Sequence, residues 1–545
     1  MAFEFTEAKQ LYGIAAGAVV LVVAAVVRLS SSSLKDIRGP APSSFWLGNQ
    51  GDILYQSEVG DVDFKWLEEY GGIVKTYGPL GTTRLMVSDP KALQYILQTS
   101  GYRYPKRHDA RAVLRMIVGH GIGGTNGEQH QRVRKIMSPA FSGPQLQSFL
   151  PLFLRYSEDL VQKWKEEEIT AETGPEPVIN VHRWLSRATL DIIGDAGFGF
   201  KFDALNNNHN DLRTVYANLF VDSTLYPYPL DIIFRIFWKY LPMSALWYLR
   251  YLPRREYYRF RTYLDAIRGY VRTKLSTELD AKGAGKEDLL SALRRANEAE
   301  GAKTKITDVE LFDQVSNIML AGHDTTASTL TFWLWELAQN TEWQTRVRQE
   351  VRAARRKIAE RGESQWAIAD YEGLTVMRAT LNEAMRLHPI VWILAREAGQ
   401  DDVIPLANPI TTKSGQKVSS VTVRKGQGVD VCIHTYNRNT DVWGPDANEW
   451  NPDRFIKTDK DSAVPLGLHA NLLNFSGGIR GCIGFRFALL EMQAIAATLI
   501  EKFEFALPPQ KDENLIRRRP TLLMVPMADG HPGIWMGLKV KVAEP

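Results

Sequence analysis

The chain has 545 residues, and its 66 lysine and arginine residues nearly balance 62 aspartate and glutamate residues, so nothing in its charge suggests nucleic-acid binding. Only two cysteines occur, which excludes a disulfide scaffold and fits a reducing environment. The length suffices for a large core, and no proline-, glycine- or serine-rich linker and no internal repeat follows residue 50.

The N-terminal part differs in kind from the rest. Leu11–Val27 is uncharged and apolar, which at the lower limit is long enough to span a bilayer. A cleaved signal peptide would carry positive charge ahead of this run, whereas here Arg28, Lys35 and Arg38 follow it. The positive-inside rule therefore places the body of the protein in the cytosol. A buried apolar helix is the alternative.

These features predict the layout of the chain. We expect a lumenal N-terminus at 1–10, a transmembrane signal anchor of the endoplasmic reticulum at 11–29, and a proline-containing hinge at 30–50. One large domain would occupy 51–545.

A glycine-rich segment, Gly119–Gly124, reads GHGIGG and formally matches the GxGxxG pattern of dinucleotide sites. Such a site also needs an acidic residue about twenty positions on, and none stands between Gln129 and Ser157. We predict a flexible loop, so the chain has no nicotinamide site of its own. In the helix that follows, His130 and Arg134 are four apart and share one face, which is also the pattern of a solvated basic face.

Two further regions carry no catalytic pattern. Leu225–Leu249 is aromatic-rich but interrupted by proline and arginine, which predicts a segment at the membrane interface or at a lipid-facing entrance. The clusters at Arg254–Arg261 and Arg517–Arg519 either meet an acidic electron-transfer partner or are solvated faces.

A long helical pattern opens at Thr307 and Glu310, which have capping-box spacing. It contains AGHDTT, in which Asp324 and Thr325 supply an acid and a hydroxyl. Thr325 alternatively bonds back to the carbonyl of Ala321, as threonines inside helices often do.

A second helical motif, LNEAMRLHP, places Glu383 and Arg386 three apart on one face. Such pairs usually lie at the surface and contribute little. The apolar neighbours and Pro389, which stops the helix, favour a buried pair here.

The segment Phe475–Gly484 reads FSGGIRGCIG and sets Cys482 in a glycine-flanked frame. A metal-binding thiolate needs nearby cations or N–H groups, and Arg480 and the following helix supply both. The alternatives are a buried thiol or a disulfide with Cys432, which we expect in the core. No CxxC motif supports zinc.

Helical periodicity dominates 151–503, and strand-like alternation occurs near RLMVSD, VSSVTV, GVDVCI and the C-terminal GIWMGLKVKV. The pattern predicts a mainly α protein with small β-sheets.

In this order and spacing, the motifs resemble the cytochrome P-450 family of haem-thiolate monooxygenases, and in particular its fungal membrane-bound members. The resemblance implies a large helical domain with a small β-rich domain, 51–545 as the catalytic domain, and haem b with Cys482 as the axial ligand of the iron. It also implies that Arg454 joins Glu383 and Arg386 in a structural network.

The resemblance further implies roles for the other site residues. Asp324 and Thr325 would guide protons to the distal face of the haem. The cofactor would contact Phe475 and Arg480 and, through its propionates, His130, Arg134 and Arg396. Tryptophan often stands in the family at the position of His130.

Electrons would come from a separate NADPH-cytochrome P-450 reductase, with cytochrome b5 as a further candidate partner. The loop before His130, the region around Leu225, Ile390–Leu394 and Leu523–Met527 are apolar, which suits a lipophilic substrate such as a terpenoid or another secondary metabolite. Two alternatives stay open: a reductase-independent isomerase or dehydratase, and a membrane-anchored haem protein without turnover.

Overall fold

The computed structural model describes residues 32–206, 215–216, 219–280, 288–301, 304–457, 466–509 and 515–544, together with Gly17, and of 274–280 the backbone alone. The expected N-terminus at 1–10 and anchor at 11–29 lie outside these residues except for Gly17. Within the described part, no helix is both long and apolar enough to cross a membrane.

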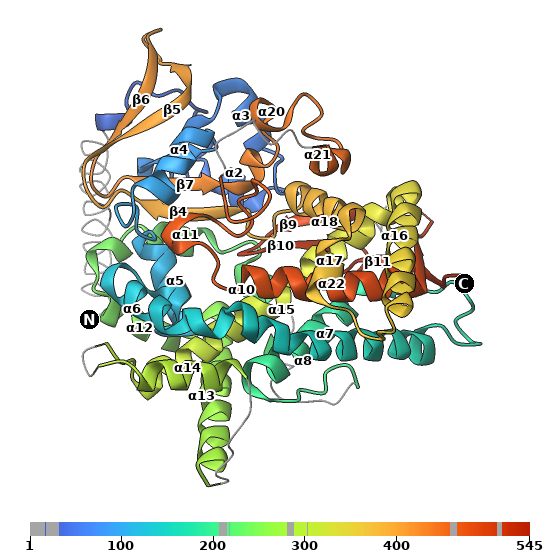
Figure 1. Cartoon of the computed structure of the whole chain (residues 1–545). Coiled ribbons are helices and arrows are strands. Elements are labelled where there is room, and N and C mark those ends of the chain that lie inside the picture. Colours follow the sequence, from blue (N-terminus) through green and yellow to red (C-terminus); the bar gives the residue numbers. More distant parts are fainter. Residues whose placement is uncertain are drawn as a thin grey trace, which may run out of the picture.

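Helices form most of the molecule (Figure 1). The longer ones are α5 (His108–Val118), α6 (Gly127–Met137), α7 (Gly143–Lys163), α8 (Val181–Phe198), α13 (Arg255–Asp280), α14 (Leu289–Glu298), α15 (Asp308–Gln339), α16 (Thr341–Glu360), α18 (Thr375–Leu387) and α22 (Phe485–Lys502). The shorter ones are α2 (Gln50–Tyr55), α3 (Asp63–Tyr70), α4 (Pro90–Gln94), α10 (Leu219–Thr224), α11 (Pro229–Arg235), α12 (Met243–Trp247), α17 (Ile368–Glu372), α19 (Ile433–Tyr436), α20 (Thr440–Trp443) and α21 (Asp453–Ile456).

Helix α15 runs through the helical body and begins with the expected capping box, since Thr307 and Glu310 each bond the other's backbone N–H. Helix α8 packs along it. This approach depends on Gly322, because a Cβ there would lie 2.7 Å from Ile193. Most of α15 is therefore buried, and it forms the axis on which the neighbouring helices are placed.

The largest sheet and one two-stranded sheet lie at one side of the helical body, whereas the other two small sheets lie near the C-terminal helix α22 (Figure 1). The largest has the order β1 (Ile73–Tyr77), β2 (Thr83–Val87), β7 (Gly428–Cys432), β4 (Ile393–Glu397), with β2 and β7 parallel and the other pairs antiparallel. The others are β5 (Asp402–Thr411) with β6 (Lys417–Val423), β9 (Ile516–Pro520) with β10 (Met524–Ala528), and β3 (Val178–Asn180) with β11 (Gly537–Val542) and β8 (Phe503–Ala506). The prediction of a mainly α protein with small sheets is confirmed.

The segment before α2 packs on this β-rich side. Leu34 and Ile37 are buried in its apolar core, and the N–H of Lys75 donates to the carbonyl of Arg38. Whether 30–50 acts as a hinge stays a prediction.

The pair predicted in LNEAMRLHP is buried. Arg386 Nε and Nη2 lie 2.7 and 2.8 Å from the two carboxylate oxygens of Glu383, and neither side chain is exposed. Arg454 Nε donates to the same carboxylate over 3.1 Å. Arg386 also donates to the carbonyls of Asn437 and Glu449. The network therefore ties α18 to the segment that leads to the cysteine loop.

Candidate active site

The loop before α22 holds Cys482 in a fixed frame. The N–H of Cys482 donates to the carbonyl of Phe475 over 2.8 Å, so the aromatic position acts here through its backbone. Gly478 has φ of +62°, and a Cβ there would lie 2.1 Å from the carbonyl oxygen of Leu97. Only glycine fits this turn.

The groups around the Cys482 sulfur have opposite effects on the pKa of its thiol. Burial raises the pKa of the thiol, while the N–H of Gly484 and the Arg134 guanidinium lower it. The side chain is nevertheless exposed, as is Ala321 in the middle of α15. We infer that both face a space that the protein surrounds. Cys432 is buried on β7 and both thiols are free, so the disulfide alternative is wrong.

Positive charge gathers beside this loop from separate parts of the chain. The side-chain nitrogens of Arg480 are buried and have no hydrogen-bond partner among the described residues, and its guanidinium lies over the Tyr102 ring. Burial and Arg480 lower the pKa of Arg396, on β4, to about 9. Burial, Arg396 and Arg480 also lower the pKa of Lys106.

The charged groups that shift the pKa values of Lys106 and Arg396 are all cations. Buried cations are costly without a counter-charge, so the arrangement suits an anionic ligand. Lys106 did not stand out in the sequence, because it belongs to no periodic pattern. Only the fold brings it near Arg396, with which it forms a backbone bridge.

His130 and Arg134 lie on α6 as expected, but their environments differ. Burial and Lys106 lead the causes that lower the pKa of His130 to about 3, so the ring is neutral near pH 7. Its Nδ1 lies 2.8 Å from the Tyr102 hydroxyl. A solvated face is therefore wrong for His130. Arg134 Nη1 donates to the carbonyl of Gly481 over 2.6 Å, which fixes the cysteine loop.

On α15, the acid and the hydroxyl have separate partners. Thr325 Oγ1 donates to the carbonyl of Ala321 over 2.8 Å, so the back-bonded alternative is present. Its lone pairs stay free to accept a hydrogen bond. Asp324 Oδ1 lies 3.1 Å from His323 Nε2, a contact that the sequence analysis missed because every residue on this helix has several candidate neighbours.

Hydrogen bonds bring together three of the four apolar segments expected near the substrate. The N–H of Met524 donates to the carbonyl of Ile390 over 2.8 Å. The N–H of Leu522 donates to Thr224 Oγ1 over 3.0 Å, which joins the C-terminal segment to the region around Leu225.

The glycine-rich loop is bound along α15 rather than flexible. The N–H groups of His120, Ile122 and Gly123 donate to side chains of α15, namely Asp313, Gln314 and Asn317. A dinucleotide site of the GxGxxG type follows a strand, whereas the apolar run before this loop is helix α5, so the structure also argues against such a site.

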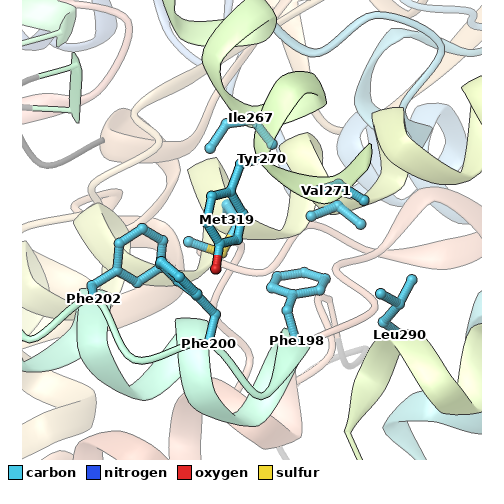
Figure 2. Close-up of a pocket in the computed structure, with 9 residues that line it drawn as sticks. Phe198, Phe200, Phe202, Ile267, Tyr270, Val271, Leu290 and Met319 are labelled. Atoms are coloured by element: carbon cyan, nitrogen blue, oxygen red, sulfur yellow. The ribbon is translucent and has the colours of Figure 1, made fainter. Parts of the chain in front are cut away.

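A separate small cavity lies among α8, α13, α14 and α15, lined by aromatic residues such as Phe198, Phe200 and Tyr270 (Figure 2). Its volume of about 10 Å³ suits about one water molecule. It includes none of the site residues named above and is too small for an organic substrate.

Comparison with known proteins gives one consistent family. The family model described as cytochrome P-450 matches residues 38–530. The cytochrome P-450 monooxygenase claO of Ampulloclitocybe clavipes is 31% identical, over 93% of this chain and 93% of its own. Two Postia placenta proteins, cytochrome P-450 monooxygenases 91 and 205, are each 32% identical and cover 87% and 94% of this chain, and 89% and 94% of their own.

Proposed function

This chain belongs to the cytochrome P-450 family and is a haem-dependent monooxygenase, and we propose that it oxidises a lipophilic organic substrate with O2 and electrons from a separate NADPH-dependent reductase. The observation that carries the proposal is the glycine-framed Cys482 beside a cluster of cations for which the described part of the chain supplies no counter-charge.

The residues present fit haem. The unpartnered guanidinium of Arg480, with Arg396, Lys106 and Arg134, would hold the two propionates, and neutral His130 would contribute a ring N–H. Cys482 would be the iron ligand: burial raises the pKa of its thiol, and the Gly484 N–H and Arg134 partly offset that effect in favour of the thiolate. Haem bound through a thiolate supplies the oxygen-activating chemistry. Asp324 would move protons toward the distal side, where Thr325 can accept a hydrogen bond.

The substrate class is supported by the apolar segments that meet near Ile390 and Met524. Walls of this kind exclude water and favour lipophilic molecules, and we propose a terpenoid or another secondary metabolite. The similarity to fungal monooxygenases supports a fungal type of enzyme.

We propose that the catalytic domain works at the cytosolic face of the endoplasmic reticulum, with cytochrome b5 as a second candidate electron donor. The segment from 225 to 249 supports membrane contact, because it consists of short helices with exposed Tyr228, Leu230 and Tyr248. The arginine clusters considered above as a surface for an acidic electron-transfer partner largely form ion pairs within the chain, for example Arg519 with Asp529 and Arg255 with Asp222.

The function is tested by expressing the full chain with a NADPH-dependent reductase and supplying a panel of terpenoids, sterols and fatty acids. We expect oxygenated products that appear only with the reductase, together with consumption of O2 and NADPH. A rearranged product without this consumption would instead indicate the isomerase or dehydratase. No product from any compound would favour a haem protein without turnover.

Replacing Arg480 with leucine should weaken haem retention. The variant loses charged hydrogen bonds to a propionate, and the rate of haem transfer to an excess of apomyoglobin should rise about tenfold or more. Arg517→Leu, which removes a partly buried arginine paired with Asp529, is the matched control and should release haem at the unaltered rate. Equal rates for both variants would remove Arg480 from the haem site.

A further inference from the structure

The face of α15 that carries Asp324 meets a buried polar cluster supplied by α8. Thr189 Oγ1 donates to the carbonyl of His323 over 3.1 Å, and His182 Nε2 lies 3.3 Å from Ser328 Oγ. His323, His182 and Thr189 are all buried. The immediate surroundings of Asp324 on this side are therefore the protein itself.

The two ring nitrogens of His323 have different partners, and these fix where hydrogen atoms lie. Nδ1 is 2.9 Å from the carbonyl oxygen of Met319, which can only accept, so Nδ1 carries a hydrogen. Nε2 is 3.1 Å from Asp324 Oδ1. A bare nitrogen and a carboxylate cannot bond to each other, so this contact requires one further proton between them.

That proton rests mainly on the histidine. The Asp324 charge raises the pKa of His323 against the opposing effect of burial. The His323 charge in turn lowers the pKa of the Asp324 carboxyl. The pair is neutral as a whole whichever partner holds the proton, which is what a buried pair needs.

We propose that His323 is a positioning and proton-storing residue for Asp324, so that the pair acts as a one-proton relay behind Thr325. The proposal rests on the role of Asp324 in the proposed function. When the relay passes its proton, the Nε2–H bond of His323 breaks and an Oδ1–H bond forms on Asp324. That O–H bond then breaks as the proton passes to an oxygen hydrogen-bonded to the carboxyl on its distal side, which leaves a neutral ring and a carboxylate. The carboxylate takes up a proton from water and passes it back to Nε2, which restores the charged ring.

The other titratable groups around the pair do not compete for this proton near neutral pH. His182 on α8 is neutral, because burial lowers its pKa to about 4. Tyr216, whose ring meets His323 at 4.7 Å, and Tyr263 on α13 both have raised pKa values through burial. On α22, Glu491 accepts from Thr326, and burial raises its pKa as well.

The first test measures the folded holoenzyme rather than its turnover. His323→Gln keeps a side-chain N–H that can bond to Asp324, but the amide carries no charge and cannot give up a proton. The Asp324 carboxylate therefore loses the neighbouring cation, and burial then raises the pKa of the Asp324 carboxyl. Above about pH 6.5 an unfolded histidine is neutral, whereas the folded His323 has a raised pKa. The native protein should therefore lose thermal stability as the pH rises from about 6.5 to 9, and His323→Gln should lack this decline. His182→Gln removes a histidine of the same cluster that is neutral in both the folded and the unfolded protein above about pH 6.5, so it should keep the native decline over this range. The same pH dependence in both variants would overturn the proposal.

The second test measures product and hydrogen peroxide per NADPH, with a substrate found in the product screen. His323→Gln and Asp324→Asn should both divert electrons to peroxide and yield product about tenfold less efficiently or worse, while His182→Gln should match the native enzyme. If Asp324→Asn alone is impaired, the relay is wrong and the role of Asp324 stands. If Asp324→Asn is unimpaired, the role of Asp324 in the proposed function is wrong, and the relay fails with it.

Discussion

Replacing Cys482 with serine is expected to abolish the absorption band at about 450 nm of the reduced carbon monoxide complex, together with all monooxygenation. Burial raises the pKa of the Cys482 thiol, and the Gly484 N–H and Arg134 partly offset that effect in favour of an anionic sulfur. A serine hydroxyl stays protonated there at neutral pH and is a poor ligand. Ultraviolet–visible spectra of the dithionite-reduced, carbon monoxide-treated protein measure the result directly.

Cys432→Ser is the matched control, because it changes the other cysteine of the chain. Cys432 lies buried on β7, with burial raising its pKa. The variant should lose some stability and keep the band. A native spectrum in Cys482→Ser, or loss of the band in a folded Cys432→Ser, would remove Cys482 from its position as iron ligand.

The largest loss of stability is expected from Glu383→Ala. The substitution leaves Arg386 as a buried guanidinium without its carboxylate and also frees Arg454 from its shared contact. Breaking a buried pair from one side costs about 3–5 kcal/mol, a large part of the stability of a typical domain. Thermal unfolding of the purified protein should show a strongly lowered midpoint, or expression should fail.

The exposed pair Arg361–Glu363 provides the comparison. Both side chains are about half exposed, and exposed pairs of this kind contribute little to stability. Glu363→Ala should therefore unfold near the native temperature. Equal losses of stability in the two alanine variants would mean that the buried contacts of Glu383 stabilise the fold no more than an exposed ion pair does.

Motifs whose chemistry is local were predictable from sequence. The glycine frame of Cys482 and the spacing of Glu383 and Arg386 specify their geometry within a few residues, and the structure has both as expected. The capping box at Thr307 was equally local. Predicting such features requires only the period of a helix or the conformation of a turn.

Features that depend on distant contacts were not predictable in this way. The glycine-rich loop looked flexible because its partners, such as Asn317, lie almost two hundred residues further along the chain. The α8 contacts of this region, such as Thr189 with the carbonyl of His323, also join residues more than a hundred positions apart, and nothing in AGHDTT encodes α8. Lys106 joins the cation cluster through β4, again by tertiary structure alone.

The cation cluster also has a consequence for biosynthesis. Its members come from both ends of the domain, Lys106 and Arg134 early in the chain and Arg396 and Arg480 late. A ribosome delivers the early pair long before residue 482 has emerged, since chains grow at about 5–20 residues per second. Loading of the prosthetic group onto the complete cluster therefore has to wait until translation is nearly complete.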